Sequence, residues 1–106
     1  MTLSTHVLDA GRGLPAAGVP VALSRRDAEG WRRIGEGVTD ADGRCRSLAP
    51  GALEPGAYRL AFDTGAYLPD GFYPEVAVAF RVTDPGRHHH VPLLLSPYSY
   101  STYLGS

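Results

Sequence analysis

Apolar and polar side chains alternate along most of the chain with a period of two. In YPEVAVAFRV every second residue from Val76 to Val82 is apolar, and the stretches PVALS and YRLAFD repeat the pattern around Val21 and Leu60. Successive side chains of a strand point to opposite faces, so each stretch predicts a strand with one face directed at a core. The β-strand is therefore the dominant predicted element.

Short segments rich in Gly and Pro separate these stretches. The sequence holds 13 Gly and nine Pro, and the breaks GRGLPAAG, DAEG, DADG, PGALEPG, DPG and SP all have turn composition. The predicted strands are 3–9, 18–25, 31–38, 43–48, 57–63, 73–83, 88–96 and 98–103. Only 64–71 favours a helical turn, which must end before Pro69. Frequent turns between short strands predict an all-β sandwich or barrel, formed as one domain over residues 1–106.

Two strands place histidines and leucines together on an outer face. In LSTHVLD, Thr5 and Val7 share the core face, so His6 and Leu8 point the other way. In HHHVPLLLS the core face takes residues 91, 93 and 95, and the outward residues are His88, His90, Pro92 and Leu94. Outward leucines followed by a tyrosine-rich tail predict an apolar patch that another copy of the chain covers. His6 and His90 would then lie in the covered face.

The composition narrows the range of partners. The chain has 106 residues, 43% of them hydrophobic and 20% charged, with a net charge of −1. Without a basic excess to release counterions, neither a nucleic acid nor an anionic membrane is an expected partner. No apolar stretch is long enough to span a bilayer, and MTLSTHVLD lacks the pattern of an export signal. A single cysteine, Cys45, cannot form an internal disulfide, so a cytoplasmic location is expected.

Several residues have a plain structural reading. An outward histidine is by itself most often a solvated side chain. His88 and His90 form an H-x-H pair of the kind that binds metals, but no third ligand lies nearby in the sequence, so no metal is expected. Asp40 and Asp42 favour a role in a hairpin turn that leads to Arg44, where an exposed arginine is common.

Longer motifs then follow one another along essentially the whole chain: LSTHVLD, GLPA, TDADGR and HVPLLLSPYSYSTY. With the terminal tetrapeptide they resemble the 5-hydroxyisourate hydrolase family, the transthyretin-related enzymes of urate breakdown. LLSPYSYST is shared with transthyretin itself, a hormone carrier. The resemblance to the hydrolases depends on His6, Arg44 and His90, where the carrier has other residue types, and on the ending Tyr-x-Gly-Ser, which the carrier lacks.

The resemblance implies a transthyretin-like sandwich of two four-stranded sheets with one short helix. It implies a homotetramer, built as a dimer of dimers, with active sites at the dimer–dimer interface. The implied reaction is hydrolysis of 5-hydroxyisourate to 2-oxo-4-hydroxy-4-carboxy-5-ureidoimidazoline. No metal or organic cofactor is implied. The outward positions of His6 and His90 agree independently with a site between subunits.

The residue types suit this chemistry. Ring opening needs a base for water, donors for the oxyanion and an acid for the leaving nitrogen, and neutral histidine serves the first and last roles near neutral pH. His6 and His90 are the expected pair, with the base undecided between them. Arg44 is expected to orient the substrate and stabilise negative charge. The expected substrate-binding residues are Tyr103, Ser106, Leu94 and Pro92.

One position departs from the family pattern. The family typically ends Tyr-Arg-Gly-Ser, whereas this chain has Leu104 at the second of these positions. Leucine has no hydrogen-bond donor, so we expect Leu104→Arg to improve substrate binding. The same departure leaves open a carrier that binds a small ligand in the same groove without turnover. A purely structural module is the third alternative, and it leaves the outward His and Leu positions unexplained.

Overall fold

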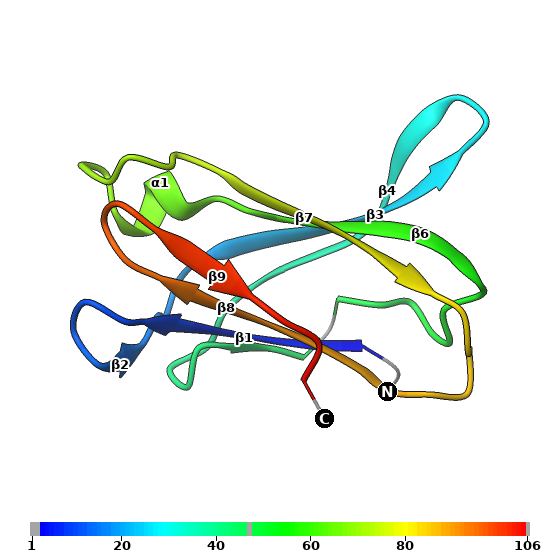
Figure 1. Ribbon diagram of the computed structural model, residues 1–106, viewed down its shortest axis with the longest axis horizontal. Coiled ribbons are helices and arrows are strands. Elements are labelled where there is room, and N and C mark those ends of the chain that lie inside the picture. The colour runs from blue at the N-terminus through cyan, green and yellow to red at the C-terminus, as the bar shows by residue number, and fades with distance from the viewer. Residues whose placement is uncertain (1–2, 47, 106) are drawn as a thin grey trace.

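The computed structural model describes residues 3–46 and 48–105, whose strands form two sheets that face each other (Figure 1). One sheet has the order β2-β1-β8-β9, with β5 also paired to β1. It comprises β1 (Leu3–Asp9), β2 (Leu14–Pro15), β5 (Arg44–Cys45), β8 (His89–Leu95) and β9 (Tyr100–Thr102). The other has the order β4-β3-β6-β7 and comprises β3 (Pro20–Asp27), β4 (Gly30–Val38), β6 (Gly56–Phe62) and β7 (Val76–Val82). The predicted all-β sandwich is confirmed.

The core lies between the sheets and takes the residues that the period-two pattern directed inward. Val7 and Leu93 from one sheet, and Leu23, Leu60 and Phe62 from the other, are fully buried. Burial of one such side chain contributes about 1.5–3 kcal/mol to folding. Most inward positions are apolar, although Thr5 and Asp9 of β1 and His89 of β8 are also buried. The alternate positions of β1, which include Ser4 and His6, are only half-buried and face outward.

The pairing of β1 with β8 is what brings the two ends of the sequence together. These strands run parallel, in a continuous register from Leu3 opposite His89 to Asp9 opposite Leu95. All the other strand pairs formed by the described residues are antiparallel. Parallel neighbours need a long crossover, and here most of the chain lies between them.

The single helix among the described residues is α1 (Thr64–Tyr67), in the segment expected to form a helical turn. The Asp63 carboxylate accepts a hydrogen bond from the Ala66 amide at 3.2 Å, as an N-cap does. The helix ends before Pro69, as predicted. No helix within residues 3–46 and 48–105 is long and apolar enough to cross a membrane.

Several element boundaries differ from the predictions. β2 lies inside GRGLPAAG, which was read as a break, and it makes the first sheet five-stranded instead of four-stranded. β5 is two residues long and not six, and β7 begins at Val76 and not at residue 73. β9 begins at Tyr100, because the Ser96 amide bonds the Ser99 carbonyl at 2.9 Å and closes a turn across residues 96–99. Turn hydrogen bonds thus replace ladder pairing where the residue pattern alone allowed a strand.

Candidate active site

The candidate site is a row of side chains across the outer face of the sheet that contains β1. In the register of β1, His6 lies opposite Arg44 of β5 on one side and opposite Pro92 of β8 on the other. His90 lies two residues before Pro92, opposite Ser4. The structure therefore brings His6, Arg44 and His90 together on three adjacent strands, as the sequence analysis expected for a catalytic group.

Arg44 is placed by the turn that precedes it. The Asp40 carboxylate accepts hydrogen bonds from the amides of Asp42 at 2.9 Å and Arg44 at 3.1 Å. The hydrogen bond from the Arg44 amide is the main reason why the pKa of Asp40 lies below its ordinary value. The turn role expected for both aspartates is confirmed. The prediction that this turn closes a hairpin is wrong, because the turn passes from β4 in one sheet to β5 in the other.

Gly43 lets the turn lie directly on β1. Its φ is +77°, a conformation that favours glycine, and a Cβ at this position would lie 2.3 Å from the Val7 carbonyl oxygen. The Val7 amide donates to the Gly43 carbonyl at 2.8 Å. The backbone contact at Gly43 therefore fixes the distance between the Arg44 strand and the His6 strand.

The hydrogen bond of His6 settles the state of one ring nitrogen. Nε2 lies 2.7 Å from the Asp42 carbonyl oxygen. A carbonyl only accepts, so Nε2 must carry a proton and donate it. In the neutral ring Nδ1 is then an unprotonated acceptor that no described residue occupies. The turn thus orients His6 as well as Arg44.

His90 is held on two sides of its ring. Nδ1 lies 2.7 Å from the Ser4 hydroxyl oxygen. The backbone of His90 is bonded to the tail, because the Gly105 amide donates to the His90 carbonyl at 2.8 Å. This brings Gly105 against another edge of the ring, where a Cβ on Gly105 would lie 2.6 Å from Cδ2 of His90. Since real Cβ atoms do not approach so closely, only glycine fits beside the ring in this position. Among the residues that the structure describes, none is hydrogen-bonded to Nε2 of His90.

The surroundings of His90 favour its neutral form. Partial burial is the largest cause that lowers the pKa of His90 below 6.5, followed by the positive charges of Arg44, His6 and His88. A histidine kept neutral near pH 7 can act as a base.

The predicted substrate-binding residues differ in how far they are exposed on the outer face. The β8–β9 register, continued through the His90–Gly105 bridge, places Tyr103 opposite Pro92, so Tyr103 extends the row and is 59% exposed. Leu94 is half-buried beside Leu8, whereas Pro92 is buried and leaves little surface for a ligand within one subunit. The prediction for Ser106 lies outside the described residues.

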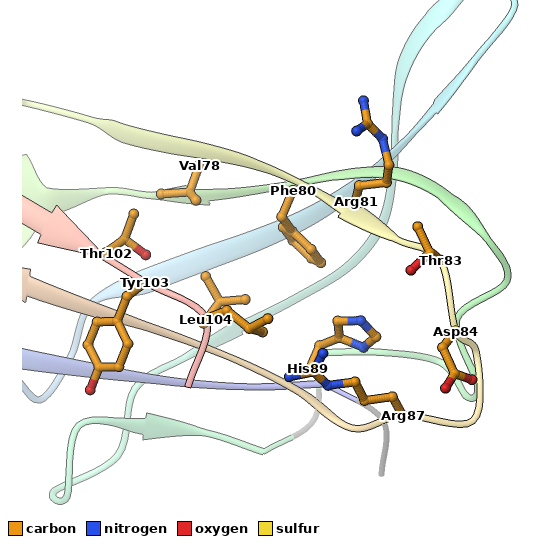
Figure 2. A pocket seen from close by; sticks show the side chains of 11 residues that line it. Val78, Phe80, Arg81, Thr83, Asp84, Arg87, His89, Thr102, Tyr103 and Leu104 are labelled. Carbon is orange, nitrogen blue, oxygen red and sulfur yellow. The ribbon is translucent and has the colours of Figure 1, made fainter. Parts of the chain in front are cut away.

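Leu104 points away from the histidine row. It lines a cavity of about 460 Å³ between β7 and the β8–β9 edge, together with Phe80 and the buried His89 (Figure 2). In the same view Tyr103 turns its ring to the other side of the strand. Within one subunit, this arrangement gives no support to the expectation that Leu104→Arg would contact a substrate on the His6 face.

The sequence analysis missed Ser4, Gly105 and the Asp42 carbonyl. Ser4 shares the outward parity of His6, a signal that was present in LSTHVLD. The backbone contacts of Gly105 and Asp42 had no such signal, because they depend on how the tail and the turn pack. In the part of the chain that the structure describes, no three His, Cys, Asp or Glu side chains gather as a possible metal site.

Comparisons with known proteins identify the family of the chain. Residues 3–105 match the model of the HIUase/Transthyretin family. A 5-hydroxyisourate hydrolase of Salmonella dublin is 48% identical over 109 residues, covering 98% of this chain and 80% of that protein. The structure of Klebsiella pneumoniae 5-hydroxyisourate hydrolase has a TM-score of 0.88 at 36% identity, covering 100% of both chains. Sea bream transthyretin in complex with thyroxine has a TM-score of 0.91 at 37% identity, covering 99% of this chain and 95% of that one. The chain therefore belongs to the HIUase/Transthyretin family.

Proposed function

We propose that this protein is a hydrolase that converts 5-hydroxyisourate to 2-oxo-4-hydroxy-4-carboxy-5-ureidoimidazoline in urate degradation. The observation that carries the proposal is that two imidazoles and one guanidinium lie on a single outer face, each ring having a nitrogen to which no described residue is hydrogen-bonded. The names of the similar hydrolases from Salmonella dublin and Klebsiella pneumoniae supply the substrate.

The three side chains would divide the reaction between them. Water attacks the ring carbonyl carbon while one imidazole of His6 and His90 takes its proton. The guanidinium of Arg44, charged at every accessible pH, stabilises the oxyanion that develops. The C–N bond then breaks, and the leaving nitrogen receives a proton from the histidine pair. A positioned acid or base of this kind contributes roughly 10²–10⁴-fold to the rate.

The assembly is part of the proposal. We infer a homotetramer, a dimer of dimers, in which a second copy covers the outer face and helps to enclose the substrate. Tyr98, Tyr100 and Tyr103 are all exposed in the single chain, which supports a tail that packs against another copy. Light scattering should report the mass of four chains, and a fully active monomer would reject the shared site. We place the protein in the cytoplasm, where fractionation of cell extracts should recover it.

The transthyretin structure favours one competing function, that of a ligand carrier. Its TM-score of 0.91 is at least as high as that of the hydrolase structure, so the fold alone does not separate the two. The residues of the row do separate them, because a carrier does not need two imidazoles with free nitrogens beside a guanidinium. The hydrolase is therefore the better-supported function.

The test is a turnover assay with 5-hydroxyisourate generated from urate in the cuvette. A hydrolase should accelerate the loss of the substrate's ultraviolet absorbance in proportion to enzyme concentration. A carrier should bind a small aromatic ligand, as measured by calorimetry, and leave the decay rate unchanged. The second result would overturn the proposal.

A further inference from the structure

Ser4 joins two histidines on the outer face. Its hydroxyl oxygen lies 2.8 Å from Nε2 of His88 and 2.7 Å from Nδ1 of His90. A hydroxyl has one proton to donate and lone pairs with which to accept. When both hydrogen bonds are made, Ser4 either donates to one ring and accepts from the other, or accepts from both rings. Because Ser4 has a single proton, it can donate to only one of the two rings.

The possible arrangements of these hydrogen bonds differ at the His90 nitrogen that faces the substrate. If Ser4 donates to His88, or accepts from both rings, then Nδ1 of His90 carries a proton and, in the neutral ring, Nε2 is an unprotonated base. If Ser4 donates to His90, then Nδ1 is the acceptor, and a neutral His90 carries its proton on Nε2 and cannot accept one there. The useful arrangements for a base are the first, in which Nδ1 of His90 carries the proton.

We propose that Ser4 is the positioning residue of His90: its hydroxyl accepts a hydrogen bond from Nδ1–H of His90 and donates one to Nε2 of His88, and so holds Nε2 of His90 ready as the general base. This inference rests on the proposed hydrolysis and names the group that the reaction left undecided. Gly105 supports it from another side, because its backbone packs against the ring edge at Cδ2 and opposes rotation of the ring.

The proton balance of the step is simple. The water oxygen bonds to the ring carbonyl carbon, and one water proton moves to Nε2 of His90. The imidazolium keeps its Nδ1 proton hydrogen-bonded to Ser4. When the C–N bond breaks, the Nε2 proton moves to the leaving nitrogen, and His90 returns to its starting state. Ser4 and His88 neither gain nor lose a proton.

A hydroxyl suits this task better than a carboxylate would. A carboxylate at the Nδ1 side would favour the charged imidazolium and raise the pKa of His90. Ser4 can fix the ring orientation without adding a negative charge. Arg44, His6 and His88 are the charged or titratable groups that act on His90, and all three lower its pKa, whereas a backbone hydrogen bond at Ser4 is a smaller effect that raises it. The His90 ring is thus both fixed in orientation and kept in its neutral form.

The decisive experiment records the ring nitrogens of His90 by ¹⁵N NMR near pH 7.5 in wild type, Ser4→Ala and Ser4→Thr. We expect Nδ1 protonated in wild type and in Ser4→Thr, which keeps the hydroxyl, and loss of that preference in Ser4→Ala. This readout does not depend on turnover. Protonation of Nε2 in the wild type would overturn the inference.

Kinetics of the same variants supply the second arm. Ser4→Ala should lower kcat about 10–100-fold with KM changed less than threefold, and Ser4→Thr should keep most of the activity. Ser24→Ala removes a hydroxyl from the other sheet and serves as the matched control. An unchanged kcat in Ser4→Ala would reject the role of Ser4. A wild-type protein without turnover would reject the proposed hydrolysis. In that case the NMR spectra would still test the tautomer of His90.

Discussion

The two faces of β1 carry polar side chains that differ in burial and in hydrogen bonding. On the inner face, Thr5 is 1% exposed and donates to the Val91 carbonyl at 2.7 Å. On the outer face, Ser4 and His6 are half-buried, and His6 bonds the Asp42 carbonyl through Nε2 while no residue within 3–46 and 48–105 is hydrogen-bonded to its Nδ1. The same alternation that buries a strand thus separates groups whose hydrogen bonds are complete from groups that can still bind a substrate.

Asp9 is the clearest inner-face case. It is 2% exposed, and its carboxylate accepts from the Tyr67 hydroxyl at 2.8 Å and from the Arg12 amide at 3.0 Å. Burial, followed by the hydrogen bond to Asp9, raises the pKa of Tyr67. A buried carboxylate often indicates a functional site, but every contact here joins β1 to its neighbouring loop and helix. Burial and charge alone therefore do not mark a site, and the proposed site is distinguished from Asp9 by ring nitrogens that no described residue hydrogen-bonds.

Removing the outer-face groups should have the largest effect on activity. His6→Gln, His90→Gln and Arg44→Gln should each lower kcat/KM at least about 100-fold, because each removes a group that acts on the reacting atoms. The melting temperature should change by only a few degrees, since these side chains lie outside the core. Arg46→Gln is the matched control for Arg44. A loss at Arg46 equal to that at Arg44 would break the comparison.

Removing the inner-face carboxylate should lower the stability of the protein and leave its activity nearly unchanged. Asp9→Asn weakens hydrogen bonds to a buried charged group, so the free energy of unfolding should fall by about 1.5–3 kcal/mol in urea titrations. Activity per folded molecule should stay within about twofold. Tyr67→Phe removes one partner and should show a smaller loss of stability. A large fall in kcat for Asp9→Asn without destabilisation would place chemistry on the inner face.

Moving an outer-face ring without removing it should have an intermediate effect. In Gly105→Ala the new methyl group meets Cδ2 of His90, so the ring must shift, and kcat/KM should fall about 10-fold. Gly51→Ala is the control, because no atom lies within 4 Å of its added Cβ. If Gly105→Ala has the activity of Gly51→Ala, the tail does not position His90.

The smallest effect concerns pH. Because the pKa of His90 is lowered in the folded protein, the acidic limb of kcat/KM should have its midpoint below 6.5. The folded state then binds fewer protons than the unfolded state, so His90 lowers stability as pH falls from 6.5 through its folded pKa. His90→Gln should flatten the stability–pH curve over that window. An acidic limb centred above 6.5 would contradict a neutral, positioned base.

The sequence could predict the faces of the strands but not which strands are neighbours. Strict alternation in LSTHVLD and HHHVPLLLS placed His6 and His90 outward, and the structure agrees. Their proximity depends on the parallel pairing of β1 with β8, which no local pattern specifies. The motif resemblance supplied that contact indirectly, through the family fold.

Short elements and backbone contacts were the parts that could not be predicted. β2 is two residues long and lies in a segment of turn composition, so its pairing with β1 had no periodic signal. The turn at Asp40 was correctly read as a turn, yet its crossing between sheets depends on the contact of Gly43 with Val7. The outward parity of Pro92 was predicted, but its burial was not.

The most direct test of the central claim is the decay of 5-hydroxyisourate with the double variant His6→Gln/His90→Gln, compared with wild type at equal concentrations of folded protein. We predict rapid decay with wild type, and with the double variant a rate close to that of buffer alone. Decay at the wild-type rate with both imidazoles removed would contradict the assignment of hydrolysis to this face of the molecule.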